Sequence, residues 1–310
     1  MVAPRICVVG SCMIDLISTV PRLPVVGETL VGRSFHLGYG GKGANQAVAA
    51  ARLGAAVSMV ARVGRDAFGE GTIRNFEAYG VDASHVGYDD RRFSGAASIL
   101  VDEHADNAIV IVPGANDGLS ADDVRAARDV ILGSDVLCCQ LEVPVETTLE
   151  ALRIARSGAV RTILNPAPAA PLPDELLRLA DFCVPNEVEA RMLTGQPVED
   201  LAGARAAARV LLDRGPSTVI VTLGARGALL IERDSAEHVP PVEVAAVDPT
   251  GAGDAFIGAL AVFVAEGRPA FQAAVAAAAV AALSVVHVGT QVSFPTRRDV
   301  EAFLGPRDAP

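Results

Sequence analysis

The sequence predicts an α/β fold: a doubly wound, mainly parallel sheet flanked by helices, with a small antiparallel β lid. The first observation is a series of short, uninterrupted apolar runs, which is typical of strands buried on both faces. The second is that helix-like segments separate these runs, an alternation that favours parallel βαβ units. The third is that residues 16–39 and 94–112 interrupt the alternation with short β-prone runs.

The apolar runs predict the strands of the large sheet. The first covers residues 6–10 and ends at a glycine. Similar runs follow at residues 57–60, 136–139, 162–164, 182–184 and 219–223. Because these runs lack polar alternation, we expect helices to cover both faces of the sheet.

The segments between the runs predict helices. Residues 44–53 are rich in alanine and are followed by Gly54, a suitable C-cap. Ser120 and Asp123 resemble a capping box that opens a helix toward residue 132. Further helices are expected at residues 147–157, 187–193, 201–214 and 270–288. The last contains Gln272, Ser284 and His287, so we expect a buried helix rather than a membrane span.

The two interrupting regions, residues 16–39 and 94–112, are expected to form one small sheet that is discontinuous in sequence. Residues 97–101 and 108–112 are its clearest strands, and residues 104–107 resemble a hairpin turn. We expect this lid to project from a single domain spanning residues 1–310. The alternative is that these segments are edge strands of the main sheet.

Composition excludes several classes of protein. The chain has 310 residues, is 51% apolar and carries 37 acidic against 26 basic side chains, a net charge of -11. This balance argues against nucleic acid or anionic membranes as partners, because both require clustered basic residues. The sequence shows no secretory signal, no C-x-x-C pair among five cysteines and no metal-ligand spacing among five histidines. We therefore expect a reduced, cytoplasmic protein.

The strongest functional signal is the segment from Val247 to Phe256, which reads V-D-P-T-G-A-G-D-A-F. Its small residues allow backbone amides to approach a ligand closely. If Asp254 opens the following helix, those amides lie at its positive end, where phosphate oxygens bind well. A carboxylate there can accept a hydroxyl proton during phosphoryl transfer. The alternative is an ordinary helix cap after a glycine turn.

The second signal is the segment from Gly38 to Gln46, which reads G-Y-G-G-K-G-A-N-Q. Its glycines allow the backbone to pack against a polyhydroxylated ligand, and Lys42 and Asn45 can bind hydroxyl groups. It is not a Walker A loop, and no G-x-G-x-x-G follows the first strand, which argues against a dinucleotide-binding oxidoreductase. A flexible turn is the alternative.

In this order and separation, the two glycine segments resemble the paired signatures of the ribokinase-like (PfkB) carbohydrate kinases. The similarity covers nearly the whole chain. It includes Q-L-E at 140–142, N-P-A-P at 165–168, N-E-V-E at 186–189 and G-T-Q-V-S at 289–293. The segment G-S-C-M-I-D at 10–15 is similar to animal-type members that act on ribose.

The resemblance implies an ATP-dependent kinase that phosphorylates the 5-hydroxyl of D-ribose and requires Mg²⁺. Asp254 would be the catalytic base, and Gly251, Ala252 and Gly253 would form the anion hole. The alternatives are a kinase for 2-deoxyribose, another sugar or a nucleoside, and, more remotely, a non-catalytic sugar-binding regulator.

The resemblance also implies the binding residues. The sugar-binding positions would be Met13, Asp15, Gly41, Lys42, Asn45, Glu142 and Asp254. The nucleotide-binding positions would be Asn186, Glu189, Thr222, Gly224, Arg226, Gly227 and Gly253. Taken alone, Asp15 could cap a turn, Glu142 could be a solvated charge and Asn186 could simply start a helix.

One position departs from the pattern of many bacterial members, which have Asn where this chain has Met13. A methionine side chain makes only weak polar contacts. This substitution could relax the discrimination between ribose and 2-deoxyribose.

The resemblance further implies a K⁺ site beside the anion hole, built largely from carbonyl oxygens, and a homodimer formed through the β lid. The matching cation positions are Asp248, Thr250, Ser284, His287, Gly289 and Ser293. A cation there would strengthen the anion-binding field of the neighbouring loop without touching the substrate.

Overall fold

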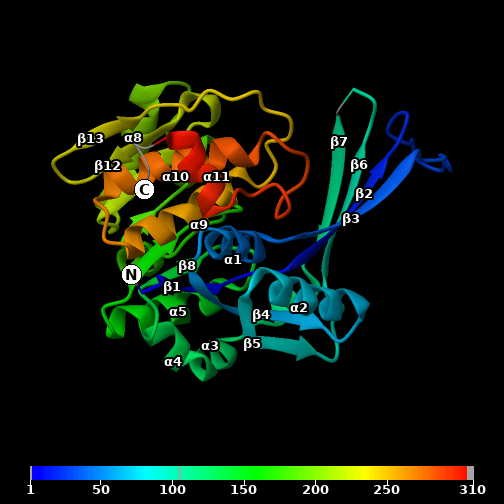
Figure 1. The fold of residues 1–310 in the computed structure, drawn as a ribbon, viewed down its shortest axis with the longest axis horizontal. Helices are drawn as coiled ribbons and strands as arrows, with labels where there is room; N and C mark the ends of the chain where they lie inside the picture. The colour runs from blue at the N-terminus through cyan, green and yellow to red at the C-terminus, as the bar shows by residue number, and fades with distance from the viewer. Residues whose placement is uncertain (1, 105, 306–310) are drawn as a thin grey trace.

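A large, mainly parallel sheet forms the centre of the molecule (Figure 1). The computed structural model describes residues 2–104 and 106–305. The nine strands lie in the order β13-β12-β11-β10-β9-β8-β1-β4-β5. Their bounds are β1 Arg5–Val9, β4 Ala56–Gly64, β5 Val81–Asp89, β8 Val136–Cys139, β9 Arg161–Leu164, β10 Phe182–Cys183, β11 Thr218–Thr222, β12 Ala228–Ile231 and β13 Ala236–Val239. The pairs β11·β12 and β12·β13 are antiparallel and the other pairs of this sheet are parallel, so the predicted fold class is confirmed.

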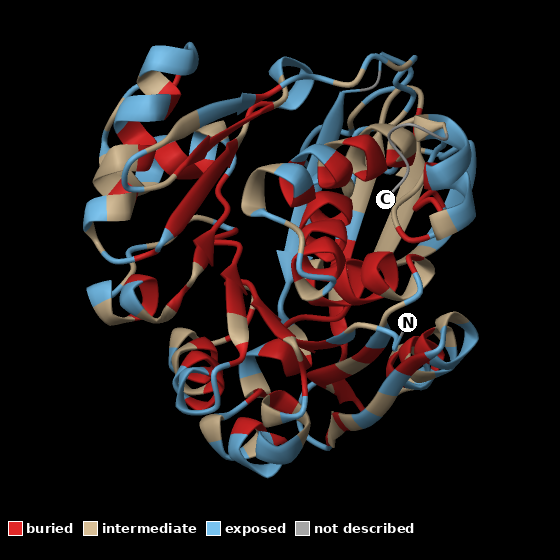
Figure 2. Ribbon diagram, turned by 60° about the vertical axis from the view of Figure 1, so that its left-hand side comes forward, coloured by how far each residue is buried: buried red, intermediate tan, exposed pale blue. Residues whose placement is uncertain are grey.

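Helices cover both faces of this sheet, as the continuous apolar strands require. In β1, Ile6 and Val8 pack into one core and Cys7 and Val9 into the other. The first core contains residues of α1 Lys42–Arg52, α2 Ala67–Tyr79, α9 Ala252–Ala265, α10 Ala270–Ser284 and α11 Arg297–Leu304. The second contains residues of α3 Ala121–Ala126, α4 Arg128–Leu132, α5 Val145–Ser157, α6 Asp174–Leu179, α7 Glu187–Thr194 and α8 Leu201–Asp213. Figure 2 shows the buried residues along these strands and helices.

Local signals in the sequence mark several helix ends correctly. Both hydrogen bonds of the Ser120–Asp123 capping box are present, although the predicted helix divides at Ala127 into α3 and α4. Gly54 follows Leu53, the C-cap of α1, and has a positive φ of 88°. The alanine-rich segment folds as α10, but the helix ends at Ser284, four residues before the predicted end at residue 288. Across residues 2–104 and 106–305, no helix combines the length and apolarity that crossing a membrane demands.

A second, four-stranded sheet stands at one side of the large one (Figure 1). We call it the small sheet; its order is β3-β2-β6-β7, with β2 Met13–Thr19, β3 Ser34–Gly40, β6 Gly95–Val101 and β7 Asn107–Val112. It is separate from the large sheet, so the alternative of edge strands is wrong.

Two hairpins build the small sheet. The pairs β2·β3 and β6·β7 are antiparallel, and the central pair β2·β6 that joins them is parallel. Strand β2 begins at Met13, three residues before the predicted region, because Met13 already pairs with Gly40 and Gly95. The expected turn at residues 104–107 includes Ala105, which lies outside the described residues.

Asn116 fixes the small sheet to the main body. Its amide oxygen accepts from Cys12 N at 2.9 Å, and its amide nitrogen donates to Cys12 O at 2.8 Å and Pro113 O at 2.9 Å. Cys12 directly precedes β2 and Pro113 directly follows β7. One fully buried side chain therefore holds both the entry and the exit of the small sheet.

Candidate active site

The predicted catalytic and sugar-binding residues gather at the point of the large sheet where successive strands are added on opposite sides of β1. From β1 the chain moves first to β4 and β5 on one side, and later to β8 and β9 on the other. Ligands of doubly wound sheets bind at the carboxyl ends of strands at such a point. Ser11 follows β1 and Glu142 follows β8, and the Ser11 hydroxyl donates to Glu142 Oε2 at 2.5 Å.

Asp254 is the carboxyl group at the centre of this region. It lies in the first turn of α9, which begins at Ala252 after Gly251, so the helix starts two residues earlier than the sequence suggested. Gly251 can occupy its left-handed conformation, with φ of 81°, because it has no side chain. Asp254 is 8% exposed, and its two oxygens accept from Asn45 Nδ2 at 2.9 Å and Gln46 Nε2 at 3.2 Å.

Close packing of α1 against α9 brings these groups together. A Cβ atom added to Gly258 would lie 2.6 Å from Gln46 O and 2.7 Å from Ala49 Cβ. The two helices can therefore approach to this distance only with glycine at 258. Because Asn45 and Gln46 lie on α1, this contact sets how far their side chains are from Asp254.

Several carboxylates surround one lysine at the site. Burial raises the pKa of Asp254, and the charge of Lys42 opposes that shift. Burial lowers the pKa of Lys42, but the negative charges of Asp254 and Glu142 together raise it by more, so the pKa lies above its ordinary value. Burial likewise raises the pKa of Glu189. Lys42 therefore remains a cation and neutralises part of this negative charge.

Asp15 completes the carboxylate group from the small-sheet side. It lies on β2 opposite Gly38, and a Cβ atom at Gly40 would be 2.4 Å from its Oδ2. Burial, together with the charges of Glu142 and Asp254, raises the pKa of Asp15 to about 6.

The remaining predicted sugar-binding residues lie in the same place. Lys42 N donates to Glu142 Oε2 at 2.9 Å. Gly41 adopts φ of 89°, and a Cβ atom there would lie 2.7 Å from Met13 N. The Met13 side chain itself is buried. The glycine loop therefore packs directly on the start of β2.

The predicted nucleotide-binding residues form a second cluster along α7 and the end of β11. Asn186 caps α7, with its side chain and that of Glu189 forming a capping box. Asn186 also makes a β-bridge with Thr222. The structural alternative for Asn186, a helix start, is thus correct, although Glu189 still lies close enough to Lys42 to interact with its charge.

The turn after β11 contains three more of the predicted nucleotide residues, and the seventh, Gly253, lies apart from them on α9. Gly224 and Gly227 both have positive φ values, 56° and 83°. The Arg226 guanidinium donates to Glu199 O at 2.5 Å and pairs with Glu187. Arg226 therefore already holds α7 to this turn.

The predicted cation residues lie on two segments that are bound to each other. The Asp248 carboxylate accepts from Thr250 N and from Gly289 N, each at 2.9 Å. Ser284 and Ser293 are buried, and their hydroxyls donate to backbone carbonyls three residues earlier. His287 is exposed.

The chemistry of these groups fits the expected cofactors. Within residues 2–104 and 106–305, no cluster of three or more His, Cys, Asp or Glu could hold a metal ion. Mg²⁺ bound mainly by phosphate oxygens and water does not require such a cluster. A Cβ atom at Gly253 would meet nothing within 4 Å, so there is open space beside the first turn of α9. A helix N-terminus with such space beside it can accept an anion.

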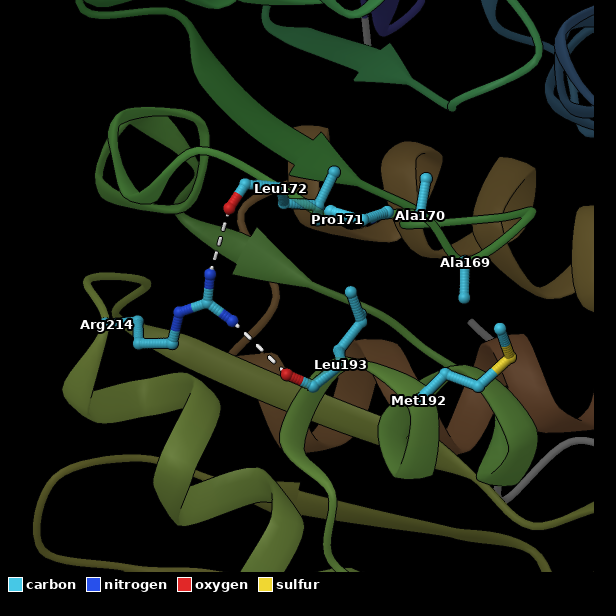
Figure 3. Close-up of a pocket in the computed structure, with 7 residues that line it drawn as sticks. All are labelled: Ala169, Ala170, Pro171, Leu172, Met192, Leu193 and Arg214. Carbon is cyan, nitrogen blue, oxygen red and sulfur yellow. Dashed lines mark hydrogen bonds between the residues drawn. The ribbon is translucent and has the colours of Figure 1, made fainter.

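A cavity elsewhere in the molecule has no part in this cluster. It encloses about 430 Å³ between the loop after β9 and α7, and Figure 3 shows its lining residues. Arg214 is its charged member, and it donates to Leu172 O at 3.1 Å and Leu193 O at 3.4 Å (Figure 3). The Arg214 guanidinium is thus already hydrogen-bonded, and the other lining residues carry apolar side chains.

Sequence reasoning assigned no role to several polar residues that the structure places at the site. Ser11 binds Glu142, and Gln46 binds Asp254. Gln140 and Gln291 are buried and bind Gln46 and Asn45 respectively. The available signal was the presence of amide side chains inside otherwise apolar segments, since such groups are buried only with partners.

Comparison with known proteins identifies the class. A family model described as pfkB family carbohydrate kinase matches residues 3–297. The chain therefore belongs to the pfkB family and is a carbohydrate kinase.

Among the members of this family, the chain is similar to kinases named for ribose and for deoxyribose. The chain is 43% identical over 307 residues to the ribokinase of Mus musculus, covering 97% of this chain and 95% of that protein. It is 42% identical over 300 residues to the deoxyribokinase of Salmonella typhi, covering 96% and 98%. Its fold matches that of Arabidopsis thaliana ribokinase complexed with ribose and ATP, with a TM-score of 0.91, 32% identity and coverage of 97% and 98%.

Proposed function

We propose that this protein transfers the γ-phosphoryl group of ATP to the 5-hydroxyl of D-ribose, giving D-ribose 5-phosphate. The observation that carries the proposal is a buried Asp254 at the start of α9, held by Asn45 and Gln46 beside Lys42. Relatives named ribokinase, with about 40% identity over nearly the whole chain, support ribose and ATP as the substrates.

In the proposed step, Asp254 is the general base. The sugar O5–H bond breaks as O5 bonds to the γ-phosphorus, and the proton passes to the Asp254 carboxylate. The bond from the γ-phosphorus to the bridging oxygen breaks, and ADP leaves with that electron pair. The amides of Gly251, Ala252 and Gly253 would stabilise the charge that develops on the phosphoryl oxygens.

The surrounding residues would orient the substrates. We assign Asp15, Lys42 and Glu142 to the sugar hydroxyls, because they meet at the loop beside Asp254. We assign Glu189 and the turn after β11 to the nucleotide. When bound, Mg²⁺ would neutralise phosphate charge, and K⁺ at the segments joined by Asp248 would strengthen the anion-binding field.

We propose that the small sheet acts as the lid of this site and as a dimer interface. Asp15 lies on its strand β2 and Gly41 directly follows its strand β3, so a change in the position of the sheet would move sugar-binding residues. Covering the sugar would exclude water and limit ATP hydrolysis.

A 2-deoxyribose kinase is the second candidate. Two observations favour it: Met13 is buried at the site where many bacterial members have a polar Asn, and deoxyribokinases are among the relatives at 42% identity. The experiment compares kcat/KM for ribose, 2-deoxyribose, fructose and adenosine, with and without K⁺. We expect ribose to give the highest value and K⁺ to raise it; a higher value for 2-deoxyribose would establish the second candidate.

The assignment of Asp254 is tested by the isosteric change Asp254→Asn. Without a proton acceptor, kcat should fall by about a thousandfold or more, and a cooperative thermal unfolding transition should show that the variant still folds. Steady-state kinetics with ribose and thermal unfolding provide the two measurements. A kcat close to that of the unmodified protein would exclude Asp254 as the base.

A further inference from the structure

Two arms of hydrogen-bonded amide side chains converge on Asp254. In the first, which we call the Asn75 arm, Asn75 Nδ2 donates to Gln291 Oε1 at 2.7 Å. Gln291 Nε2 then donates to Asn45 Oδ1 at 3.0 Å, and Asn45 Nδ2 donates to Asp254 Oδ2 at 2.9 Å. The arm thus connects α2, through the loop before α11 and through α1, to α9.

The second arm, the Gln140 arm, reaches the other carboxylate oxygen. Gln140 Nε2 donates to Gln46 Oε1 at 2.5 Å, and Gln46 Nε2 donates to both Asp254 Oδ1 and Asn165 Oδ1, each at 3.2 Å. Gln46 and Gln140 are 0% exposed. Gln140 follows β8 directly, so this arm begins at the point where strands are added on opposite sides of β1.

All these amides point the same way, and the reason is the charge at their end. An ionised carboxylate can only accept hydrogen bonds, so the amide next to it must present its nitrogen. The oxygen of that amide then faces away from the carboxylate and needs a hydrogen-bond donor. Gln291 donates to the oxygen of Asn45, and Gln140 donates to the oxygen of Gln46. Turning over any one amide would leave two oxygens or two nitrogens facing each other.

We propose that Asn75, Gln291 and Gln140 are positioning residues of the phosphoryl transfer, which fix Asn45 and Gln46 so that N–H donors rather than carbonyl oxygens face Asp254. The proposal rests on the proposed function, in which Asp254 is the base. It extends that function to residues that need not touch the sugar or the nucleotide.

The charges around Asp254 explain why these donors matter. Burial raises the pKa of Asp254, and the nearby carboxylate of Glu142 acts in the same direction. Asp15 and Glu189 add further negative charge, and Lys42 is the cation that opposes it. The hydrogen bonds from Asn45 and Gln46 also lower the pKa of Asp254. Without correctly turned amides, the pKa of Asp254 would therefore be higher still.

Two substitutions at Asn75 distinguish positioning from packing. Asn75→Asp keeps the shape of the side chain but replaces the donor with an acceptor. Gln291 must then turn its nitrogen toward residue 75 and its oxygen toward Asn45, which in turn presents its oxygen to Asp254. Asn75→Ala only removes one end of the arm and leaves Gln291 free to keep its orientation. Because Asn75 is half-buried, an aspartate there can keep solvent contact and the chain should fold.

The experiment measures kcat against pH for both variants, with ribose, ATP, Mg²⁺ and K⁺. We expect Asn75→Asp to lower kcat at neutral pH by about tenfold to a hundredfold, the value of a hydrogen bond to a charged group, and to move the acidic limb to higher pH. Asn75→Ala should have a smaller effect, and the KM for ATP should stay within about twofold in both. Salt at about 0.5 M should not restore the Asp variant, since it screens a distant charge but does not turn an amide.

Gln272→Glu, an exposed amide-to-acid change on α10, is the matched control and should leave kcat unchanged. The proposal is overturned if Asn75→Asp behaves like the unmodified protein, or if Asn75→Ala costs as much or more. Should the Asp variant unfold, Gln291→Met provides the test, because it removes the donor to Asn45 without adding charge. If Asp254→Asn is inactive while the Asn75 and Gln291 variants are normal, only the positioning roles fail; if Asp254→Asn is active, the base assignment fails.

Discussion

Among single residues, Asp15 is one whose ionised side chain lowers the stability of the fold but could bind a ligand. Its carboxyl group lies between the small sheet and the carboxylates of Glu142 and Asp254, and its pKa is raised from 3.8 to about 6. The folded protein therefore favours the protonated form, whereas the unfolded chain does not. Ionised Asp15 consequently costs folding free energy at neutral pH, and a polyhydroxylated ligand could recover that cost through hydrogen bonds.

This cost can be measured with Asp15→Asn. The native pKa exceeds the unfolded value, so the free energy of unfolding decreases as the pH rises from about 4 to about 6. At pH 7.5 the variant should be more stable than the unmodified protein, by on the order of 2 kcal/mol. The advantage should shrink as the pH is lowered toward 4. Denaturant unfolding at several pH values measures the stability difference between the two proteins at pH 7.5 and its decrease toward pH 4.

The control for this measurement is Asp234→Asn, because Asp234 is exposed in the turn between β12 and β13. We expect no comparable gain from it. A destabilised Asp15→Asn protein at pH 7.5 would show that the ionised carboxylate of Asp15 stabilises the fold instead.

Residue types were more predictable than their hydrogen-bond partners. Asp254, Lys42 and Asn45 stand in short glycine-rich motifs, so their chemistry is visible in the sequence, and the structure brings them together. The bond between Asn75 and Gln291 joins positions 216 residues apart. No local pattern encodes such a contact, because it depends on how α2 packs against the loop before α11.

At the scale of elements, the contact between α1 and α9 controls the geometry of the site. Gly258→Ala tests this directly. In an unobstructed helix, alanine would be more stable than glycine by about 1 kcal/mol. Here the new Cβ atom would lie 2.6 Å from Gln46 O, so we expect the helices to separate, with a loss of about 1–3 kcal/mol in unfolding free energy and a lower kcat.

Thermal unfolding and steady-state kinetics of Gly258→Ala provide the measurements. The sign of the stability change decides the outcome. A more stable variant with normal kcat would mean that α1 and α9 need not approach as closely as this packing implies.

Element patterns also explain which strands the sequence revealed. Strand β8 is buried throughout, and β1 is buried from Ile6 to Val9; both form continuous apolar runs, so they were predicted. Strand β5 lies at the sheet edge, contains Asp82, Ser84 and His85, and was not predicted. Strands β12 and β13 were also missed, because they add an antiparallel hairpin to a sheet for which only βαβ units were expected.

At the scale of the whole molecule, the small sheet exposes a group of apolar side chains, and such groups are often covered by a partner. All six residues of β7 are exposed, including Ile109 and Ile111, which are 52% and 54% exposed and lie on the same face. Pairing with a second copy through this sheet would bury them. We therefore predict a homodimer.

Light scattering at micromolar concentration measures the assembly. We expect twice the 31.9 kDa of one chain, and the double change Ile109→Asp and Ile111→Asp should reduce it to the mass of one chain. Val188→Asp, at a residue 53% exposed on α7, is the control and should remain dimeric. A single-chain mass for the unmodified protein would contradict the prediction.

The bond from Asn45 to Asp254 has a consequence for biosynthesis, because its two ends are separated by 209 positions. A ribosome translates Lys42 and Asn45 early, yet α9 emerges only after most of the polypeptide has been made. Nascent chains thus lack the proton acceptor during most of elongation. Incomplete products of translation should consequently be unable to consume ATP, whatever sugar they encounter.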